Sequence, residues 1–207
     1  MPTRAKSIFL LLFVGTAVGW CQQTAANKMS YDGMIQKIKT GDRNIDFREL
    51  RIAYADSSVQ PDTSEQKKKM FAELKAEKYA DAIKSAEAVL NGDFADIDAH
   101  YVAFAANRAL NNAEQADFHK WAFQGLVDSI MHSGDGKTMA TAYEVVEVHE
   151  EYVVLRYLGL MPGEQSLLNQ GAHSYDKMVA IDPKTNEKVQ LFFNIDIEEK
   201  HLHDALK

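Results

Sequence analysis

The chain has 207 residues, of which 46% are hydrophobic and 26% charged, and its formal net charge is −7. This mixture is ordinary for a globular protein, and the length suffices for one domain of good size or for a helical part and a sheet part that share one core. The only run of basic residues is Lys67-Lys68-Lys69, which we interpret as the solvated face of a helix. An acidic chain without a larger basic patch lacks the electrostatic footprint of a nucleic-acid-binding protein, so we expect no nucleic acid as a partner.

The N-terminal segment 1–21 is typical of a secretory signal peptide. Arg4 and Lys6 provide a positive n-region, and the apolar run that follows is too short to cross roughly 30 Å of hydrocarbon as a helix. We expect cleavage after Cys21, export to the periplasm or the outside of the cell, and no integral membrane segment in the mature chain. A lipid anchor on Cys21 is the alternative, although a lipoprotein would need a small residue where Trp20 stands. Because Cys21 is the only cysteine, the folded body has no thiol for a disulfide, for catalysis or for a metal.

Helical periodicity dominates residues 30–136. Ser30 is a suitable N-cap for a first short helix, and Asp46 for a second. Four further segments carry apolar residues at helical spacing, and each is bounded by residues that start or stop helices. Asn112, with Gln115 three positions later, predicts a capping box at the start of the last helix.

The four longer helices are expected to form two tandem helical hairpins. When Tyr79 and Ala82 are moved on by 34 residues, they fall on Ala113 and Ala116, which are small positions where a second helix packs closely on a first. The stretches EKYADAIKSAEAVL and NNAEQADFHKWAFQ are therefore similar to the second half of a tetratricopeptide repeat. Because a solenoid normally needs three repeats, we predict a pair of repeat-like hairpins and not a true array.

After Thr138 the pattern becomes that of strands. The stretch AYEVVEVHEEYVVLRYLGL is rich in Val, Tyr and Leu, and we interpret HEE as the turn of a hairpin. In SYDKMVAIDPKTNEKVQLFFNID, two strand-like runs flank a turn in which Pro183 comes early and Asn186 is available for a positive φ. Four antiparallel strands are predicted, or five if residues 165–168 also pair. One face of such a sheet must be covered, and the helices are the available cover.

The predicted fold class is therefore α+β, with about five or six N-terminal helices followed by a C-terminal antiparallel sheet of 4–5 strands. The divisions along the chain follow from the changes in pattern. They are a signal peptide 1–21, a disordered linker 22–29, a helical part 30–136, an antiparallel β part 137–199 that shares one core with the helices, and a flexible C-terminus 200–207.

The stretch SGDGKT, residues 133–138, ends in the Gly-Lys-Thr of a phosphate-binding loop. A Walker-type loop needs a glycine five positions before Gly136, where this chain has Met131, and it leads from a buried strand into a helix. Here a helix precedes the stretch and strands follow it, so we expect no nucleotide. We interpret it as a helix C-terminus in which Gly134 and Gly136 allow left-handed conformations and Asp135 lies in a tight turn.

No motif carries a complete catalytic mechanism, and we predict no catalytic residue, no metal ligand and no cofactor. The nearby carboxylates Glu147, Glu150 and Glu151 could act as a pair, but charged residues at a hairpin turn are usually solvated. Polar groups on a loop held by two rigid elements are a reasonable place for a ligand site. The candidates for ligand binding are Ser133, Asp135 and Lys137 at the helix–sheet junction, and His100, which the DIDAH segment places near two aspartates at a helix start.

Several stretches resemble a family of secreted bacterial proteins known as domain of unknown function 4919. They are, in chain order, DFRELRIAYADS, DIDAH, GLVDSIMHSGDG, EEYVVL and YDK…LFFNID. The similarity spans roughly residues 31–196, and its most specific piece lies in residues 125–136. The resemblance implies a bacterial, exported, single-domain protein, and it brings no activity and no catalytic residues with it. It also suggests that the helix ending in SGDG is a feature of the family.

These observations favour a non-catalytic binding or interaction module of the cell envelope, whose helical hairpins offer a groove to an envelope protein or peptide. The alternative is a small hydrolase or metal-dependent enzyme with a site at the helix–sheet junction near Ser133–Lys137. The absence of a motif with a complete mechanism favours the binding module.

Overall fold

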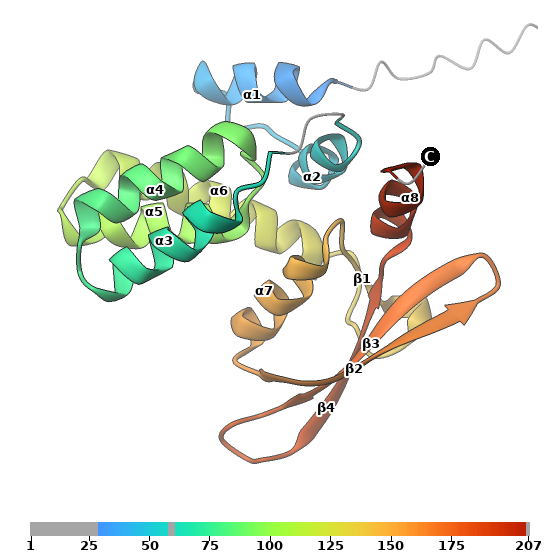
Figure 1. Ribbon diagram of the computed structural model, residues 1–207. Coiled ribbons are helices and arrows are strands. Elements are labelled where there is room, and N and C mark those ends of the chain that lie inside the picture. The colour runs from blue at the N-terminus through green and yellow to red at the C-terminus, as the bar shows by residue number, and fades with distance from the viewer. Residues whose placement is uncertain (1–28, 58–60, 206–207) are drawn as a thin grey trace, which may run out of the picture.

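The computed structural model describes residues 29–57 and 61–205 (Figure 1). The segments predicted as signal peptide and disordered linker lie outside the described residues, apart from Met29. Six helices come first: α1 (Tyr31–Lys39), α2 (Phe47–Ala55), α3 (Ser64–Lys75), α4 (Tyr79–Gly92), α5 (Ile97–Ala109) and α6 (Ala113–Met131). A short 3₁₀ turn, η1, and the mixed second half follow: η1 (Met139–Thr141), β1 (Tyr143–Glu144), α7 (Val148–Leu158), β2 (Met161–Gln170), β3 (His173–Ile181), β4 (Lys188–Asn194) and α8 (Asp196–Ala205).

The helix starts follow the capping chemistry of the sequence in most places. Ser30 Oγ accepts a hydrogen bond from the backbone N–H of Gly33 (3.2 Å), and Asp46 Oδ1 accepts one from the backbone N–H of Glu49 (3.1 Å), as predicted. The capping box predicted at Asn112 is wrong. Its side-chain amide instead donates to Asn107 (3.1 Å), and its side chain makes no capping hydrogen bond at the start of α6.

The sheet has the order β1-β4-β3-β2. β3 pairs antiparallel with both β2 and β4, and the turn between β3 and β4 places Asn186 at a φ of 58°, as its position in the sequence predicted. β2 includes residues 165–168, so the additional strand also forms. The α+β fold class is therefore confirmed, with the helices mostly before a C-terminal sheet.

The sheet is mixed, and two details of the predicted β part are wrong. β1 pairs parallel with β4, with Tyr143 opposite Phe193, because α7, β2 and β3 provide the long connection that a parallel pair requires. The segment expected to form a hairpin around HEE is the helix α7. Two glutamates in its first turn suit the positive end of the helix dipole, and Gly159 ends it in a left-handed conformation with a φ of 72°.

α8 covers much of the segment 200–207 that was expected to be flexible. It follows β4 directly and packs on α2 and β3 (Figure 1). No described residue of α8 is fully buried. Its attachment to the rest of the protein therefore depends strongly on polar contacts.

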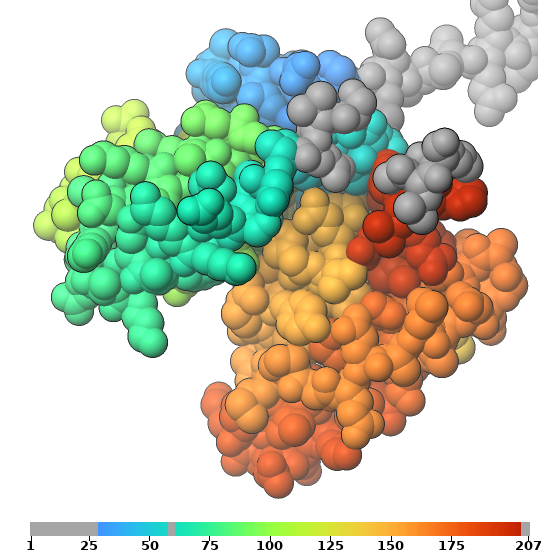
Figure 2. Space-filling model, in the orientation of Figure 1, coloured from blue at the N-terminus to red at the C-terminus, as the bar shows by residue number. Residues whose placement is uncertain are grey.

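Apolar side chains gather in two clusters. The larger one joins α1, α2, α6 and α7 to the sheet, and Leu50, Leu126 and Phe193 are completely buried in it. The smaller one holds α3, α4 and α5 together through residues such as Met70 and Ala82. In Figure 2 the helices α3–α6 and the β half form two lobes, with a notch between them beside α3 and α7. We call these the helical lobe and the β lobe.

Ala82 and Ala116 are both buried, as small residues at a close helix contact should be. The tetratricopeptide-like character of the hairpins nevertheless stays a prediction. Among the described residues, no helix combines the length and the apolar character needed to cross a bilayer.

Candidate functional site

Three glutamates at the start of α7 each belong to a different polar network. Glu147 precedes the helix, and Glu150 and Glu151 lie in its first turn. The side chains of Glu150 and Glu151 are buried, which corrects the expectation that these carboxylates are solvated. The reason is that the stretch is a helix packed between the two lobes and not an exposed hairpin turn.

The first network is a buried ion pair between α2 and α7. Arg51 is completely buried, and its Nε and Nη2 atoms donate to the two carboxylate oxygens of Glu150 at 2.7 and 2.6 Å. The guanidinium also donates to Ser129 Oγ (3.1 Å) on α6 and to the backbone oxygen of Glu144 (2.9 Å) on β1. Glu150 in turn accepts from the backbone N–H of Val146 (2.8 Å). One arginine on α2 thus binds three segments, α6, β1 and α7, that lie far from it in the sequence.

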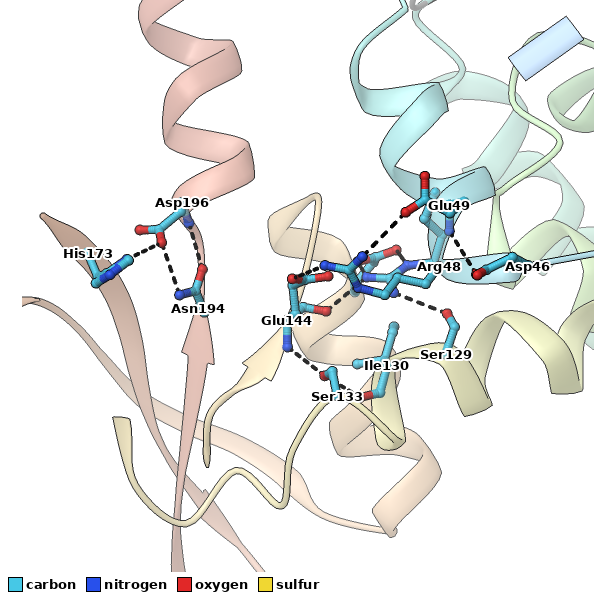
Figure 3. Close-up of polar contacts among 12 residues, drawn as sticks. Asp46, Arg48, Glu49, Ser129, Ile130, Ser133, Glu144, His173, Asn194 and Asp196 are labelled. Atoms are coloured by element: carbon cyan, nitrogen blue, oxygen red, sulfur yellow. Dashed lines mark hydrogen bonds and ion pairs between the residues drawn. The ribbon is translucent and has the colours of Figure 1, made fainter. Parts of the chain in front are cut away.

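The loop after α6 is hydrogen-bonded to β1, the strand that Arg51 also contacts. Ser133 Oγ donates to the backbone oxygen of Ile130 (2.6 Å) and accepts from the backbone N–H of Glu144 (2.8 Å), as Figure 3 shows. The Glu144 side chain pairs with Arg48 at 2.7 Å. The hydroxyl of Ser133 is therefore engaged both as donor and as acceptor, and it positions the start of β1.

The other two loop candidates contact each other. Asp135 Oδ1 accepts from Thr141 Oγ1 (2.6 Å) and from the backbone N–H of Lys137 (3.0 Å), and these hydrogen bonds, with Thr141 first, lower the pKa of Asp135. The Lys137 ammonium lies 3.5 Å from the Asp135 carboxylate, and 78% of its side chain is exposed. The loop leads from α6 into η1 and β1, which is the reverse of the strand–loop–helix order of a Walker-type loop.

The two glycines of this loop have different tasks. Gly136 has a φ of 66°, as expected, whereas Gly134 does not adopt a positive φ. A Cβ atom at Gly134 would lie 2.3 Å from the backbone oxygen of Thr141 and 2.6 Å from that of Ala142. Gly134 is therefore required for close approach of two backbone segments, which corrects the left-handed conformation predicted for it.

His100 lies elsewhere, in the interior between α5 and α6. One ring nitrogen is 3.0 Å from His119 Nδ1, and the other is 2.9 Å from the backbone oxygen of Phe94. Burial, followed by the neighbouring His119, lowers the pKa of His100 to about 3, and burial lowers that of His119 to about 4. The structure brings together Ser133, Asp135 and Lys137 but does not bring His100 to them.

The second network is a carboxylate cluster between α7, the sheet and α8. We define it as Glu151, Asp176 and Glu198. Gln165 Nε2 donates to Glu151 (3.1 Å) and to Asp176 (2.6 Å). Burial, then the charge of Asp176 and a hydrogen bond to it, raises the pKa of Glu151 to about 9. This pKa keeps Glu151 mostly protonated at pH 7, beside the carboxylate of Asp176.

The third network lies where the helical lobe meets α7. Lys67 and Asp96 form an ion pair at 2.6 Å, and His149 and Glu147 form another at 3.0 Å. Burial alone would lower the pKa of His149, but the hydrogen bond to Glu147 and the charges of Asp96 and Glu147 raise it to about 9. We call Lys67, Asp96, Glu147 and His149 the charged junction. A set of ion pairs between two lobes that includes a histidine with a raised pKa is the kind of place where functional sites occur.

A cleft continues from the charged junction between the two lobes. Phe71 lies one helical turn after Lys67 on α3, and Val153 lies one turn after His149 on α7, so these pairs share faces. The cleft has a volume of about 250 Å³. We call it the interlobe groove, and it is lined by Phe71, Asp98, Tyr101, Phe123, Val153, Arg156 and Tyr157. An ion pair between Asp98 and Arg156 links its two sides.

Sequence reasoning missed Arg51 and treated Lys67 as solvated. Arg51 falls among the apolar positions of α2, beside Leu50 and one turn after Phe47, and a charge on a buried face requires a buried partner. That signal was available in the sequence, but the identity of the partner was not. Within residues 29–57 and 61–205, no group of three or more His, Cys, Asp or Glu side chains is placed to hold a metal ion.

The sequence matches the family described as Domain of unknown function (DUF4919) over residues 22–203. The chain belongs to this family. No curated protein and no solved structure matched the chain. The stretches that carry the family resemblance supply many of the contacts described above: DFRELR contains Arg51, GLVDSIMHSGDG contains Ser129 and Ser133, EEYVVL contains Glu150 and Glu151, and YDK contains Asp176.

The role of the loop glycine can be tested directly. Gly134→Val should lower the free energy of unfolding by at least about 2 kcal/mol, because its side chain would overlap the backbone of Thr141. Lys137→Ala, three residues away, should change it by less than about 0.5 kcal/mol, since the lysine side chain is mostly solvated. Urea unfolding of both variants measures this. Equal midpoints for Gly134→Val and the wild type would contradict the assignment.

The buried ion pair makes a second prediction. Arg51→Met should destabilise the fold by about 3–5 kcal/mol, because it leaves the carboxylate of Glu150 buried without its partner. Adding Glu150→Leu should recover part of this loss, so that the two changes are not additive. Arg48→Met on the same helix is the control, and it should cost at most about 1 kcal/mol because its ion pair is exposed. Additive effects of Arg51→Met and Glu150→Leu would show that the pair acts as two independent residues.

Proposed function

We propose that this member of the family is an exported bacterial protein that acts as a non-catalytic binding module of the cell envelope. The N-terminal sequence supports export, because a positive n-region precedes a short apolar run. The periplasm or the extracellular side is the proposed location, with a lipid anchor on Cys21 as the alternative.

The interlobe groove is the proposed binding site, and its exposed aromatic side chains are the observation that carries this. Phe71, Tyr101 and Tyr157 are 38%, 43% and 54% exposed, although each lies beside the others in one cleft. Aromatic residues are enriched in binding surfaces because they bury a large area with few rotatable bonds. The Asp98–Arg156 pair adds charges of both signs at the same place.

The proposed occupant is a polypeptide segment that inserts an apolar side chain into the groove. The cleft lies between α3, α5 and α6 on one side and α7 on the other, and grooves between helices commonly receive such segments. The similarity of the helical hairpins to tetratricopeptide repeats supports the same class of partner. The charges of Asp98 and Arg156 would meet the polar backbone on either side of the inserted residue.

The chemistry of the helix–sheet junction favours a binding module over the alternative of a hydrolase. The hydroxyl proton of Ser133 is directed to a backbone oxygen, and no basic side chain contacts that hydroxyl in the described residues. Nucleophilic catalysis by serine needs a base within hydrogen-bond reach. The carboxyls of Glu151 and Asp176 are almost completely buried, which favours a structural role for them.

Export can be tested on the native protein. The intact mass of the protein from the envelope fraction of its bacterium should correspond to a chain that begins at Gln22. A mass that includes Met1, found in the cytoplasm, would contradict export. A diacylglyceryl group on Cys21 would establish the lipid-anchored alternative.

The binding site can be tested with a photo-crosslinking amino acid in place of Tyr157. It should capture one defined envelope polypeptide, whereas the same amino acid in place of Leu202, which is 59% exposed on α8 and outside the groove, should not. Phe71→Asp should reduce capture about tenfold or more, because it puts a charge in the apolar part of the site. The matched control is Leu110→Asp, which changes an exposed apolar residue outside the groove.

Two results would oppose this proposal. Capture that is unaffected by Phe71→Asp would show that the partner binds elsewhere. A stoichiometric transition metal in the purified protein, with no captured partner, would favour the enzyme alternative.

A further inference from the structure

α8 rests on a site that is crowded with carboxylates. Glu198 of α8 lies close enough to Asp176 of β3, and to Glu147 and Glu150 at the start of α7, for their charges to act on its carboxylate. The buried oxygens Glu151 Oε1 and Glu198 Oε2 receive no hydrogen bond from the described part of the chain. Three ionised carboxylates could not remain together here, because each unpaired buried charge costs several kcal/mol.

We propose that α8 is a proton-dependent latch, which stays docked while Glu151 and Glu198 of the carboxylate cluster hold protons and detaches when these two glutamates lose them. Protonated, Glu151 can donate to Asp176, and the cluster carries less charge against α8. Deprotonated, the same groups repel one another across the contact between α8, α7 and β3.

The direction of the pH effect follows from the pKa values. Burial, then the charges of the neighbouring carboxylates, raises the pKa of Glu198 to about 7, and similar causes raise that of Glu151 to about 9. Both groups have an ordinary value of 4.5 when exposed. The docked state therefore binds protons more tightly, so docking is strongest at low pH and weakens as the pH rises from about 5 to about 9.

The rest of the α8 contact is suited to a latch. Asp196, at the first turn, accepts from the backbone N–H of Ser174 (2.8 Å) and pairs with His173 (2.6 Å), and Figure 3 shows it beside Asn194. Lys200 and His201 pair with Asp56, which follows the last residue of α2, at 3.3 and 3.5 Å. The contacts of Asp196 would hold the start of α8 in place. The ion pairs with Asp56 lie at the surface and contribute little to stability, so the carboxylate cluster determines whether the helix docks.

Other charged groups face the same contact, and they must be separated from the cluster. α7 contributes Glu147 and Glu150, each with its own cationic partner, and it also contributes His149, whose pKa of about 9 lies in the same pH range. From α8 itself, the carboxylate of Glu199 accepts a hydrogen bond from the Ser174 hydroxyl. Because His149 would remain in a Glu151 variant, removing only the Glu151 carboxylate tells the two sources apart.

The test is hydrogen–deuterium exchange of the α8 amides in the full chain at about pH 6 and about pH 9, corrected for the intrinsic pH dependence of exchange. Wild-type α8 should lose protection by about tenfold or more over this range, while the amides of α4, in the separate smaller core, keep theirs. Residue 151 cannot ionise in Glu151→Gln, so its α8 should lose clearly less protection than wild-type α8 between about pH 6 and about pH 9. Glu164→Gln, on the opposite face of neighbouring β2, is the matched control and should behave as the wild type.

Glu198→Gln provides a second variant if Glu151→Gln does not fold, and it should also reduce the loss of protection at high pH. Equal protection of wild-type α8 at both pH values would overturn the proposal. So would the same loss of protection in wild type, Glu151→Gln and Glu198→Gln, since this would assign the effect to His149 or to general unfolding.

Discussion

The buried ion pair between Arg51 and Glu150 is the contact on which the arrangement of the two lobes depends. A fully buried guanidinium must have its donors satisfied, and here the partners come from α6, β1 and α7. This requirement fixes α7 against α2 and sets the position of the short strand β1. The same guanidinium also binds the backbone of Glu144, on the strand that pairs parallel with β4 at the edge of the sheet.

α7 is the element that connects this constraint to possible functions. Its first turn carries Glu150 into the ion pair and Glu151 into the carboxylate cluster, and Glu147 just before it lies in the charged junction. Its later turns provide Val153, Arg156 and Tyr157 to the interlobe groove. One helix thus links the proposed binding surface to the proposed proton-dependent contact of α8. The geometric reason is that neighbouring side chains on a helix point in different directions while they share one rigid backbone.

Local signals were enough to predict much of the N-terminal helical part of the chain. Ser30 and Asp46 mark helix starts by their own capping hydrogen bonds, and α6 ends at Met131 before the glycine-containing loop. The segment 142–158 was more difficult, because Val, Tyr and Leu favour strands while its glutamates suit a helix start. Packing between the lobes favours a helix over residues 148–158, because the helical conformation buries Val153, Val154 and Leu155 together. Intrinsic preference is weak compared with such burial.

The sequence by itself determined the α+β class, the β3–β4 hairpin with its positive φ at Asn186, and the fact that the SGDG loop follows a helix. Each of these depends on residues close together in the chain. Only the tertiary structure decided that Arg51 meets Glu150, that Glu151 and Asp176 meet at the side chain of Gln165, and that Gly134 is needed for close approach and not for a left-handed conformation. These are contacts between residues distant in sequence, and the charge state or backbone space at each position depends on partners that periodicity and capping do not reveal.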